Sequence, residues 1–599
     1  MKHQNLENRK YAFWSFIIII GIIFTARLFV LQIIDSSYND KADNNAFLHK
    51  TIYPSRGLIY DRNGILLVYN RPAYDVMITI REVEPFDTLD FCNTVNYTKE
   101  QFIRRIADIQ DRRKNRGYSR WVPQLLIAQL SPQEYGELQE KLYRFPGFEV
   151  RERILREYKF PNAAHILGSI GEVSREDIER DPYYRQGDYA GRDGVEFTYE
   201  KHLRGIKGAE IFLRDSRGRL QGRFNNGEND KSPTPGENLH LSIDIELQAY
   251  GELLMQNKIG SIVAIEPETG EILAMVSNPT YNPASLVGRA RGDAYKALEQ
   301  NPHKPLMNRA TQATYSPGST FKPIQALVGL QEGVITPSTA YPCGGPGAKP
   351  IKCMGSHGGI SLLPSIQRSC NPYYWHLFNN LLNKRGATLK QNYQRWRDDM
   401  LSLNLGRKFD SDIYSQVSGN IPSVEYYDRI YGGRWNAMTV RSNSIGQGEV
   451  LLTPLQMANV MAIIANRGFY RVPHLARLDT FNIKIPTAIE QQHFDPVKEG
   501  MALVMTAGTG ARQQVPGLSM GGKTGTTQNS RGKDHSMFVG FAPVENPKIA
   551  IAVAVENAGF GGTYAAPIAS LMMEMFIKRE ISPSRKETEE RMINANLMN

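Results

Sequence analysis

A long apolar stretch near the N-terminus does most to limit what this chain can fold into. Residues 11–34 are predominantly hydrophobic, and Arg27 is their only charged residue. About 20 such residues are enough for a helix to cross a lipid bilayer, and an arginine near one end can extend its charge to the interface. We therefore predict a cytoplasmic tail over residues 1–10 and a single membrane-spanning helix over residues 11–34.

The charges around this stretch predict its orientation. Lys2, Arg9 and Lys10 precede it, and basic residues favour the cytoplasmic side of a membrane. A cleaved signal peptide would need a shorter apolar region followed by a small-x-small cleavage site, which the residues after Leu31 do not offer. The N-terminus is therefore expected inside the cell, with everything after the helix outside the cytoplasm.

Turn signals and composition divide the remaining chain. The length of 599 residues suggests several domains. Residues 35–240 are expected to form a β-rich unit that contains an Asn63-Gly64 hairpin turn. The polar, proline-containing stretch 227–236 is interpreted as the linker to a larger unit over residues 241–578. Residues 579–599 are charged and are expected to be a polar tail that frays.

The larger unit has the pattern of an α+β fold. Apolar runs at 261–265 and 271–276 flank a Pro-Glu-Thr-Gly turn, and further strand-like runs follow at 538–541 and 549–555. The middle of this unit is helical in pattern, and an apolar stretch over 565–578 predicts a closing helix. Strands, then helices, then strands again favour an antiparallel sheet sandwiched by helices.

The charge and the cysteine count exclude two classes of protein. The net charge is +10, which suits an anionic lipid surface or an acidic polymer as well as nucleic acid. No zinc-finger spacing or RNA-binding aromatic signature accompanies that charge, so we expect no nucleic-acid partner. Four cysteines are too few for a fold held together by disulfides.

A Ser-x-x-Lys motif is the first candidate for catalytic chemistry. Ser319 follows a Pro-Gly turn, and Lys322 comes three residues later, ahead of an apolar run. A helix beginning near Ser319 would place the lysine one turn along, beside the serine hydroxyl. Serine needs a nearby base to act as a nucleophile, and an amine partly removed from water can hold a pKa low enough for that role. The motif alone is common and specifies little.

Two further motifs make the Ser-x-x-Lys motif specific. Ser369-Cys370-Asn371 lies 50 residues after Ser319, and Lys523-Thr524-Gly525-Thr526 lies 204 residues after it. Ser-x-x-Lys, Ser-Asp-Asn and Lys-Thr-Gly together are the signature of class A β-lactamases and penicillin-binding proteins. This chain keeps the order of the three motifs, and Cys370 stands where the signature has aspartate.

The chain resembles class B penicillin-binding proteins, the monofunctional peptidoglycan D,D-transpeptidases, along nearly its whole length. Within that class it is similar to the elongation-type enzymes that maintain cell shape. Besides the anchor and the three motifs, the resemblance rests on Arg56-Gly57, Asp61-Arg62-Asn63-Gly64, Gly194-Val195-Glu196, Ser444-Ile445-Gly446-Gln447-Gly448-Glu449 and Glu556-Asn557-Ala558-Gly559. It implies a non-catalytic pedestal of the dimerisation type over residues 35–240 and a transpeptidase domain over residues 241–578.

The resemblance also implies a serine mechanism that needs no cofactor. Ser319 would attack the carbonyl between two D-alanines of a stem peptide while Lys322 takes its proton. Ser369 and Asn371 would pass the proton to the leaving amine and position the peptide. The backbone N–H groups of Ser319 and Thr526 would hold the oxyanion. The substrate's carboxylate would be seated by Lys523, Thr524, Gly525 and Thr526, and β-lactams would acylate the same serine.

The expected partners follow from the same resemblance. They are peptidoglycan stem peptides, β-lactams and the membrane, together with a multi-span RodA-type glycan polymerase and other elongation-complex proteins. The expected place is the cytoplasmic (inner) membrane, with the catalytic domain in the periplasm. The alternatives are a division-type transpeptidase of the same class, a β-lactamase, a β-lactam sensor and a non-catalytic scaffold.

Four residues near the second motif form a candidate metal site. Cys343, Cys353, His357 and Cys370 follow one another at spacings of 10, 4 and 13 residues. Zinc accepts three thiolates and one imidazole. Some elongation-type relatives carry a metal here with a histidine and a cysteine among its ligands, and His357 and Cys370 resemble those two. A Cys343–Cys353 disulfide and free thiols are the alternatives to a structural zinc ion. Cys92 is expected to be a buried small apolar residue.

Overall fold

The structure is a computed structural model, and it describes residues 4–30, 47–115, 118–215, 220–529 and 532–598. The chain divides into two compact units, one built from residues 1–56 and 204–237 and the other from residues 57–203 and 238–599. Within the second unit, the pedestal strands share a hydrophobic core with the C-terminal part of the chain. The domain boundaries expected near residues 240 and 578 stay predictions.

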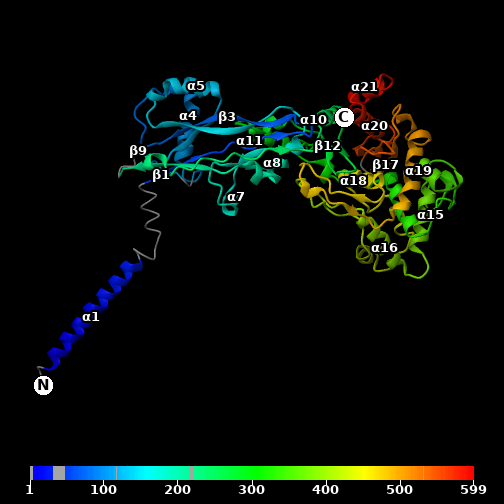
Figure 1. Ribbon diagram of the computed structural model, residues 1–599, viewed down its shortest axis with the longest axis horizontal. Coiled ribbons are helices and arrows are strands. Elements are labelled where there is room, and N and C mark those ends of the chain that lie inside the picture. Colours follow the sequence, from blue (N-terminus) through cyan, green and yellow to red (C-terminus); the bar gives the residue numbers. More distant parts are fainter. Residues whose placement is uncertain (1–3, 31–46, 116–117, 216–219, 530–531, 599) are drawn as a thin grey trace. The chain divides into compact units, whose positions relative to one another are not determined.

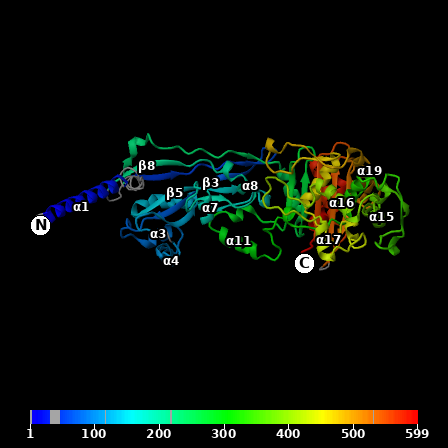
Figure 2. The same cartoon turned by 90° about the horizontal axis from the view of Figure 1, so that it is seen from below.

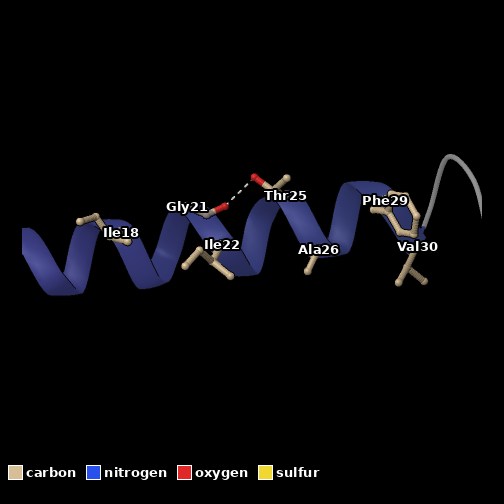
Figure 3. A pocket seen from close by; sticks show the side chains of 7 residues that line it. All are labelled: Ile18, Gly21, Ile22, Thr25, Ala26, Phe29 and Val30. Carbon is tan, nitrogen blue, oxygen red and sulfur yellow. Dashed lines mark hydrogen bonds between the residues drawn. The ribbon is translucent and has the colours of Figure 1, made fainter.

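Helix α1 (Gln4–Phe29) is the predicted anchor (Figure 1). Its segment Lys10–Phe29 is long and apolar enough to cross a membrane. Figure 3 shows one face of the helix, where the Thr25 hydroxyl donates a hydrogen bond to the carbonyl oxygen of Gly21 at 2.8 Å. That bond satisfies a polar side chain within the helix itself, as a hydrocarbon environment requires. The expected end of the span at residues 31–34 lies outside the described residues.

The rest of the first unit is a small antiparallel sheet. Its strands, in spatial order, are β1 (Phe47–Ile52), β8 (Gly208–Arg214) and β9 (Leu220–Arg223). The stretch 227–236, expected as a linker, is instead paired: Lys231 exchanges backbone hydrogen bonds of 2.8 Å with Ala209. Thr234 likewise exchanges bonds of 2.9 Å with Ile206. Pro233 lies between Lys231 and Thr234, whose backbone N–H groups donate in these pairs, and Pro235 follows Thr234, so the prolines do not prevent the pairing.

The N-terminal part of the second unit is organised by the long strand β3 (Leu66–Ile78), which pairs along its length with β5 (Phe148–Tyr158). The same sheet contains β2 (Ile59–Tyr60), β4 (Gln124–Leu130) and β10 (Leu239–His240). Figure 2 shows α3 (Thr88–Thr94) and α4 (Lys99–Gln110) together beside this sheet. Helix α5 (Pro132–Lys141) completes a separate core, which includes Phe91, Phe145 and, as predicted, a buried Cys92.

A buried ion pair accounts for one of the stretches that carry the family resemblance. Glu196 lies in α8 (Gly194–Thr198) and accepts a 2.6 Å hydrogen bond from Nε of Arg156, and both side chains are fully buried. The same guanidinium donates to the Asn70 side chain at 2.9 Å, which ties α8 to β3 and β5. Removing one member of such a buried pair is strongly destabilising, because the other charge stays in the core.

The sheet of the C-terminal part is fully antiparallel, as predicted. In spatial order its strands are β12 (Ile272–Asn278), β11 (Gly260–Ile265), β19 (Ile549–Val555), β18 (His535–Ala542) and β17 (Gly521–Thr527). Helices α10 (Ile245–Met255) and α20 (Ala565–Lys578) pack against each other and the sheet, and α18 (Pro454–Ala465) packs on the opposite side (Figure 1). Because helices cover both faces, strands β11, β12 and β19 are buried along their whole length.

The helical middle of the chain lies between these strands in sequence and forms the second wall of the site described below. Its main helices are α13 (Lys322–Gln331), α14 (Leu362–Gln367), α15 (Asn371–Leu382), α16 (Leu389–Ser402), α17 (Val424–Tyr431) and α19 (Phe494–Ala507). Helices α14 and α19 pack on each other, and α19 also packs on β17. The observed architecture is therefore the predicted α+β fold, with a sheet flanked by helices.

The expectation that the C-terminus frays is wrong. Residues 586–594 form helix α21 (Lys586–Asn594), in which Met592 is fully buried. Arg585 turns inward and contacts the buried Glu574 carboxylate at 2.8 Å. Lys258 donates hydrogen bonds to the carbonyl oxygens of Met592 and Ala595 at 2.5 and 3.0 Å, which satisfies the last turn of the helix. The charges that suggested a solvated tail are partly used in packing.

Candidate active site

Ser319 lies in a short 3-10 turn (Gly318–Phe321) that leads directly into α13, so the predicted helix start is confirmed with a tighter first turn. Lys322 is the first residue of α13, three residues after Ser319, so the two residues lie about one turn apart on the same side of this helical segment. Gly318 has a φ of +57°, and a Cβ there would lie 2.7 Å from the carbonyl oxygen of Thr526. Glycine therefore lets the serine turn approach the strand that carries the third motif.

Lys322 joins the first motif to the second. Its side chain is fully buried, and Nζ donates hydrogen bonds to Ser369 O at 2.7 Å, Ser369 Oγ at 3.0 Å and Asn371 Oδ1 at 2.6 Å. Ser369 adopts a φ of +58° just before α15, which turns both its carbonyl and its hydroxyl toward the amine. The structure thus brings together Lys322, Ser369 and Asn371, as the sequence predicted.

Burial controls the protonation of the two lysines. Removal from water lowers the pKa of Lys322 to about 8. Lys523 is also fully buried, and its pKa is held well below its usual range, first by burial and second by the charge of Lys322. The two amines are therefore close enough to influence each other. Carrying a proton on both at once is unfavourable in this site.

The simplest expectation is a hydrogen bond between the Ser319 hydroxyl and the amine of Lys322, its expected base, and the structure differs from it. Among the described residues, no hydrogen bond joins Ser319 Oγ to Lys322 Nζ. The three oxygens around Nζ can take all three hydrogens of an ammonium group. A neutral amine has only two hydrogens and a lone pair, so loss of one proton would free Nζ to accept from a hydroxyl. Catalytic contacts of this kind often tighten only when substrate binds.

Strand β17 at the end of the sheet carries the third motif and faces the serine turn. A Cβ on Gly525 would lie 2.7 Å from Thr320 Cγ2 and 3.2 Å from the carbonyl oxygen of Pro317. Gln447 donates to the carbonyl oxygen of Thr526 at 3.3 Å, and Lys523 donates to the carbonyl oxygen of Thr524 at 3.1 Å. The glycine at position 525 is therefore required for β17 to lie against the turn that presents the serine.

Two residues of this site were missed by sequence reasoning. The hydroxyls of Thr509 and Thr524 are 2.6 Å apart, so Thr509 sets the orientation of a threonine in the third motif. It lies in a Gly508-Thr509-Gly510 turn whose glycines were the only local signal. Gln447 belongs to a stretch that carried the family resemblance, yet only the fold shows that its amide reaches β17.

His535 at the start of β18 is part of the frame of the site. Its Nδ1 accepts a hydrogen bond from the backbone N–H of Asn557 at 3.0 Å, and its ring packs edge-on against Tyr315, four residues before Ser319. Burial lowers the pKa of His535. The Tyr315 hydroxyl in turn donates to Glu556 at 2.9 Å. These contacts hold the segment that leads into the serine turn.

The four candidate metal ligands form one cluster. Their ligand atoms all lie within 4.8 Å of one another. The thiols of Cys343 and Cys353 lie 3.5 and 3.9 Å from Nδ1 of His357, and all three cysteines are free and buried. Zinc–sulfur bonds of about 2.3 Å in a tetrahedron place two sulfurs about 3.8 Å apart. The donor set and its spacing therefore fit a zinc ion.

The comparisons with known proteins agree with this geometry. The family model described as "Penicillin binding protein transpeptidase domain" matches residues 260–574, and the one described as "Penicillin-binding Protein dimerisation domain" matches residues 51–241. The chain therefore belongs to the penicillin-binding protein transpeptidase family. A relative from Acinetobacter baumannii, "Peptidoglycan D,D-transpeptidase MrdA", is 31% identical over 623 residues, which cover 97% of this chain and 89% of the relative.

Solved structures share this fold over most of the chain. A complex of penicillin-binding protein 2 (PBP2) and MreC from Helicobacter pylori matches with a TM-score of 0.74 at 23% identity, covering 88% of this chain and 99% of the other. At 23% identity this likeness is evidence for the fold alone. A chain from the structure described as "Structural coordination of polymerization and crosslinking by a peptidoglycan synthase complex" matches with a TM-score of 0.69 at 25% identity, covering 96% and 99%.

Proposed function

We propose that this chain is a membrane-anchored serine D,D-transpeptidase that cross-links peptidoglycan stem peptides during cell elongation. One observation carries the proposal: the buried amine of Lys322 contacts both Ser369 and Asn371, one turn from Ser319, and the serine turn packs against the strand that holds Lys523. A nucleophile, a base of lowered pKa and a second buried amine in one site are the components of acyl transfer. The relatedness to peptidoglycan D,D-transpeptidases named MrdA supports the substrate class.

Acylation begins with neutral Lys322. Its amine accepts the Ser319 hydroxyl proton while Oγ attacks the carbonyl carbon between two D-alanines. The backbone N–H groups of Ser319 and Thr526 would hold the oxyanion, an interaction worth about 3–4 kcal/mol per donor in comparable enzymes. The proton then passes from Lys322 through Ser369 Oγ, 3.0 Å away, to the departing D-alanine nitrogen. The peptidyl ester on Ser319 remains.

The substrate's terminal carboxylate is expected to bind along β17. Lys523 supplies the cation, and the hydroxyls of Thr524 and Thr526 supply hydrogen-bond donors, with Thr509 orienting the first of them. A carboxylate next to Lys523 also offsets the effect of burial on its pKa and favours its charged form. Gly525 keeps the strand free of a side chain that would fill the space beside the serine turn.

The second half-reaction makes the cross-link. An amine from a neighbouring stem peptide attacks the ester carbonyl, and its proton returns through the same base while Ser319 leaves as the hydroxyl. β-Lactams acylate Ser319 because their strained amide and carboxylate occupy the positions of the D-Ala-D-Ala terminus. A β-lactamase would hydrolyse that adduct rapidly, so its persistence distinguishes the two classes of enzyme.

Zinc belongs to the proposal as a structural element. Cys343, Cys353, His357 and Cys370 would hold it, and the ion would fix the loop that contacts the second motif. The transpeptidase chemistry itself uses only side chains and backbone groups of this chain. Purified protein that still lacks zinc and keeps a Cys343–Cys353 bridge in a non-reducing peptide map, after treatment with a dithiol reductant and added zinc, would contradict a resident metal.

The proposed setting is the cytoplasmic membrane, with α1 as a single anchor, the N-terminus inside and the catalytic domain in the periplasm. Support comes from the apolar helix and the basic residues before it. The proposed partners are a RodA-type glycan polymerase and other elongation-complex proteins. The structural relative within a peptidoglycan synthase complex supports that class of assembly. A division-type transpeptidase would share the chemistry and differ in localisation.

Penicillin labelling tests the enzymatic proposal. The full chain in detergent is treated with penicillin and its intact mass is measured, followed by peptide mapping of the adduct. One adduct on the peptide containing Ser319 is expected, and it should be absent from Ser319→Ala. Labelling at another residue, or a scaffold that takes up no drug, would refute the assignment.

A further inference from the structure

The cysteine cluster is linked to the catalytic amine by short contacts. Cys370 lies between Ser369 and Asn371, both of which accept hydrogen bonds from Lys322 Nζ. From the other side, the Asn371 side-chain amide donates to the carbonyl oxygen of Lys352 at 2.8 Å, directly before Cys353. A movement of the loop at Cys353 therefore changes the position of a group that orients Lys322.

The three thiols lie within 4.8 Å of one another, and two of them belong to one loop. Cys343 and Cys353 lie at the two ends of one loop, Cys343 in the three-residue strand β13 (Tyr341–Cys343) and Cys353 in irregular structure. Cys370 comes directly before α15, and all three thiols are buried. Met354, the residue after Cys353, is 83% exposed. We take Cys353, which adjoins that exposed residue, as the thiol that a small oxidant meets first, and Cys343 as the resolving thiol.

We propose that Cys343 and Cys353 form a peroxide-sensitive switch that lowers the acylation rate of Ser319 when they join as a disulfide. The zinc-thiolate cluster is the reduced state of this site and the Cys343–Cys353 bridge is its oxidised state. The proposal rests on the proposed transpeptidase function for its readout. The oxidant is a hydroperoxide, with hydrogen peroxide as the probe.

The reaction balances as a two-electron exchange. The Cys353 thiolate attacks one peroxide oxygen, the O–O bond breaks, and the sulfur becomes a sulfenic acid as hydroxide leaves. The Cys343 thiolate then attacks that sulfur, the S–S bond forms and a second hydroxide leaves. With two protons from solvent, the products are one disulfide and two waters. A dithiol reductant reverses the step by thiol–disulfide exchange.

Oxidation would have two consequences at the site. A disulfide places its sulfurs about 2.05 Å apart, so the segment at Lys352 and Cys353 must shift toward Cys343. The bridge also leaves only His357 and Cys370 as ligands, too few for a tetrahedral zinc site. Asn371 then loses the carbonyl partner that holds its amide, and Lys322 loses a fixed acceptor. We expect acylation to slow by at least about tenfold, the effect of one lost hydrogen bond to a charged group.

The experiment uses the full chain in detergent, loaded with zinc, before and after hydrogen peroxide. Three quantities are measured: zinc released to a chromogenic chelator, cysteine pairing by non-reducing peptide mapping, and the second-order rate constant for acylation by a fluorescent penicillin. The expected result is about one zinc released per chain, a Cys343–Cys353 bridge with Cys370 still open to alkylation, and the slower acylation. Dithiothreitol with added zinc should restore the rate.

Matched variants assign the effect to the pair. Cys343→Asp removes one thiol and keeps a possible metal ligand, and Cys353→Ser removes the other thiol. For each variant, the acylation rate constant after peroxide is divided by the rate constant before it. This ratio is compared between variants, because it does not depend on how fast the untreated variant is. Both ratios should approach one, whereas Cys92→Ser, in the separate core near α3, should keep the full peroxide effect. Thermal unfolding checks that each variant is folded.

Several outcomes would overturn the switch. A complete Cys343–Cys353 bridge with unchanged acylation would show that the cluster is not coupled to Lys322. A bridge to Cys370, or sulfinic acid without a bridge, would contradict the assigned pair. If the reduced chain took up no penicillin, the transpeptidase proposal would fail instead, and zinc release with peptide mapping would still decide whether the disulfide step occurs.

Discussion

The pH dependence of Ser319 acylation is the sharpest test of the proposed base. The active form of Lys322 is the neutral amine, and its pKa is lowered by burial to about 8 from an ordinary value of 10.5. At pH 7 a pKa of 8 leaves about 9% of the amine neutral, whereas 10.5 would leave about 0.03%, a difference of about 300-fold in active base. Acylation should therefore increase as pH rises and level off above about pH 8.

Asn371→Asp tests the cause of that profile. The substitution keeps the shape of the side chain and places a carboxylate where Oδ1 now lies 2.6 Å from Lys322 Nζ. An adjacent negative charge favours the protonated amine and raises its pKa by about 1–3 units. Acylation at pH 7 should fall by about 10- to 1000-fold, with the midpoint of the profile moved to higher pH and part of the rate recovered there.

The assay is the second-order rate constant for labelling by a fluorescent penicillin, measured from pH 6 to pH 10 on both proteins. Circular dichroism at each pH confirms that the chain remains folded, and the hydrolysis of free drug is measured in parallel. A variant with a reduced rate but the same midpoint as the parent would refute the assignment of Lys322 as the titrating base. A flat parent profile would refute it as well.

Further substitutions test other contacts. Thr509→Val removes the hydroxyl 2.6 Å from Thr524 and should slow acylation by about 5- to 100-fold without lowering the melting temperature, whereas Thr509→Ser should retain most of the rate. Gly525→Ala places a methyl group 2.7 Å from Thr320 Cγ2, which is too close for two carbon atoms, so penicillin labelling should be nearly lost. Unchanged labelling would contradict the close packing of β17 against the serine turn. Arg156→Met removes the guanidinium that donates to the buried Glu196 carboxylate at 2.6 Å and should cost about 3–5 kcal/mol in denaturant unfolding. The double change with Glu196→Leu should recover much of that loss, and an equal loss in both would argue against charge as the cause.

Periodicity and motif order predicted the elements that bury their side chains most completely. The run at 549–555 is apolar throughout because helices cover both faces of β19, and such a pattern has few alternatives. The Ser-x-x-Lys spacing likewise predicts its own geometry, since Ser319 and Lys322 are only three residues apart. The meeting of Lys322 with Ser369 and Asn371 followed from the signature of the three motifs and not from local pattern.

Sequence reasoning failed where polar residues are used in packing. The charged C-terminus was expected to fray, yet Arg585 pairs with the buried Glu574 and Lys258 binds the end of α21. Lys258 lies more than 300 residues before α21, so no local pattern contains that interaction. Glu574 and Arg585 are eleven residues apart, and Thr509 and Thr524 are fifteen apart, but neither spacing has a helical or strand period that predicts a contact.

The mutual influence of the two buried amines has a consequence for how the enzyme selects its peptide. We expect a ligand that brings its own negative charge to Lys523 to favour a proton there, and the repulsion between the two amines would then disfavour a proton on Lys322. Binding of the peptide terminus would in this way favour the neutral form of the proposed base. A peptide with an amidated end should accordingly lose far more in the rate of the first chemical step than in occupancy of the cleft.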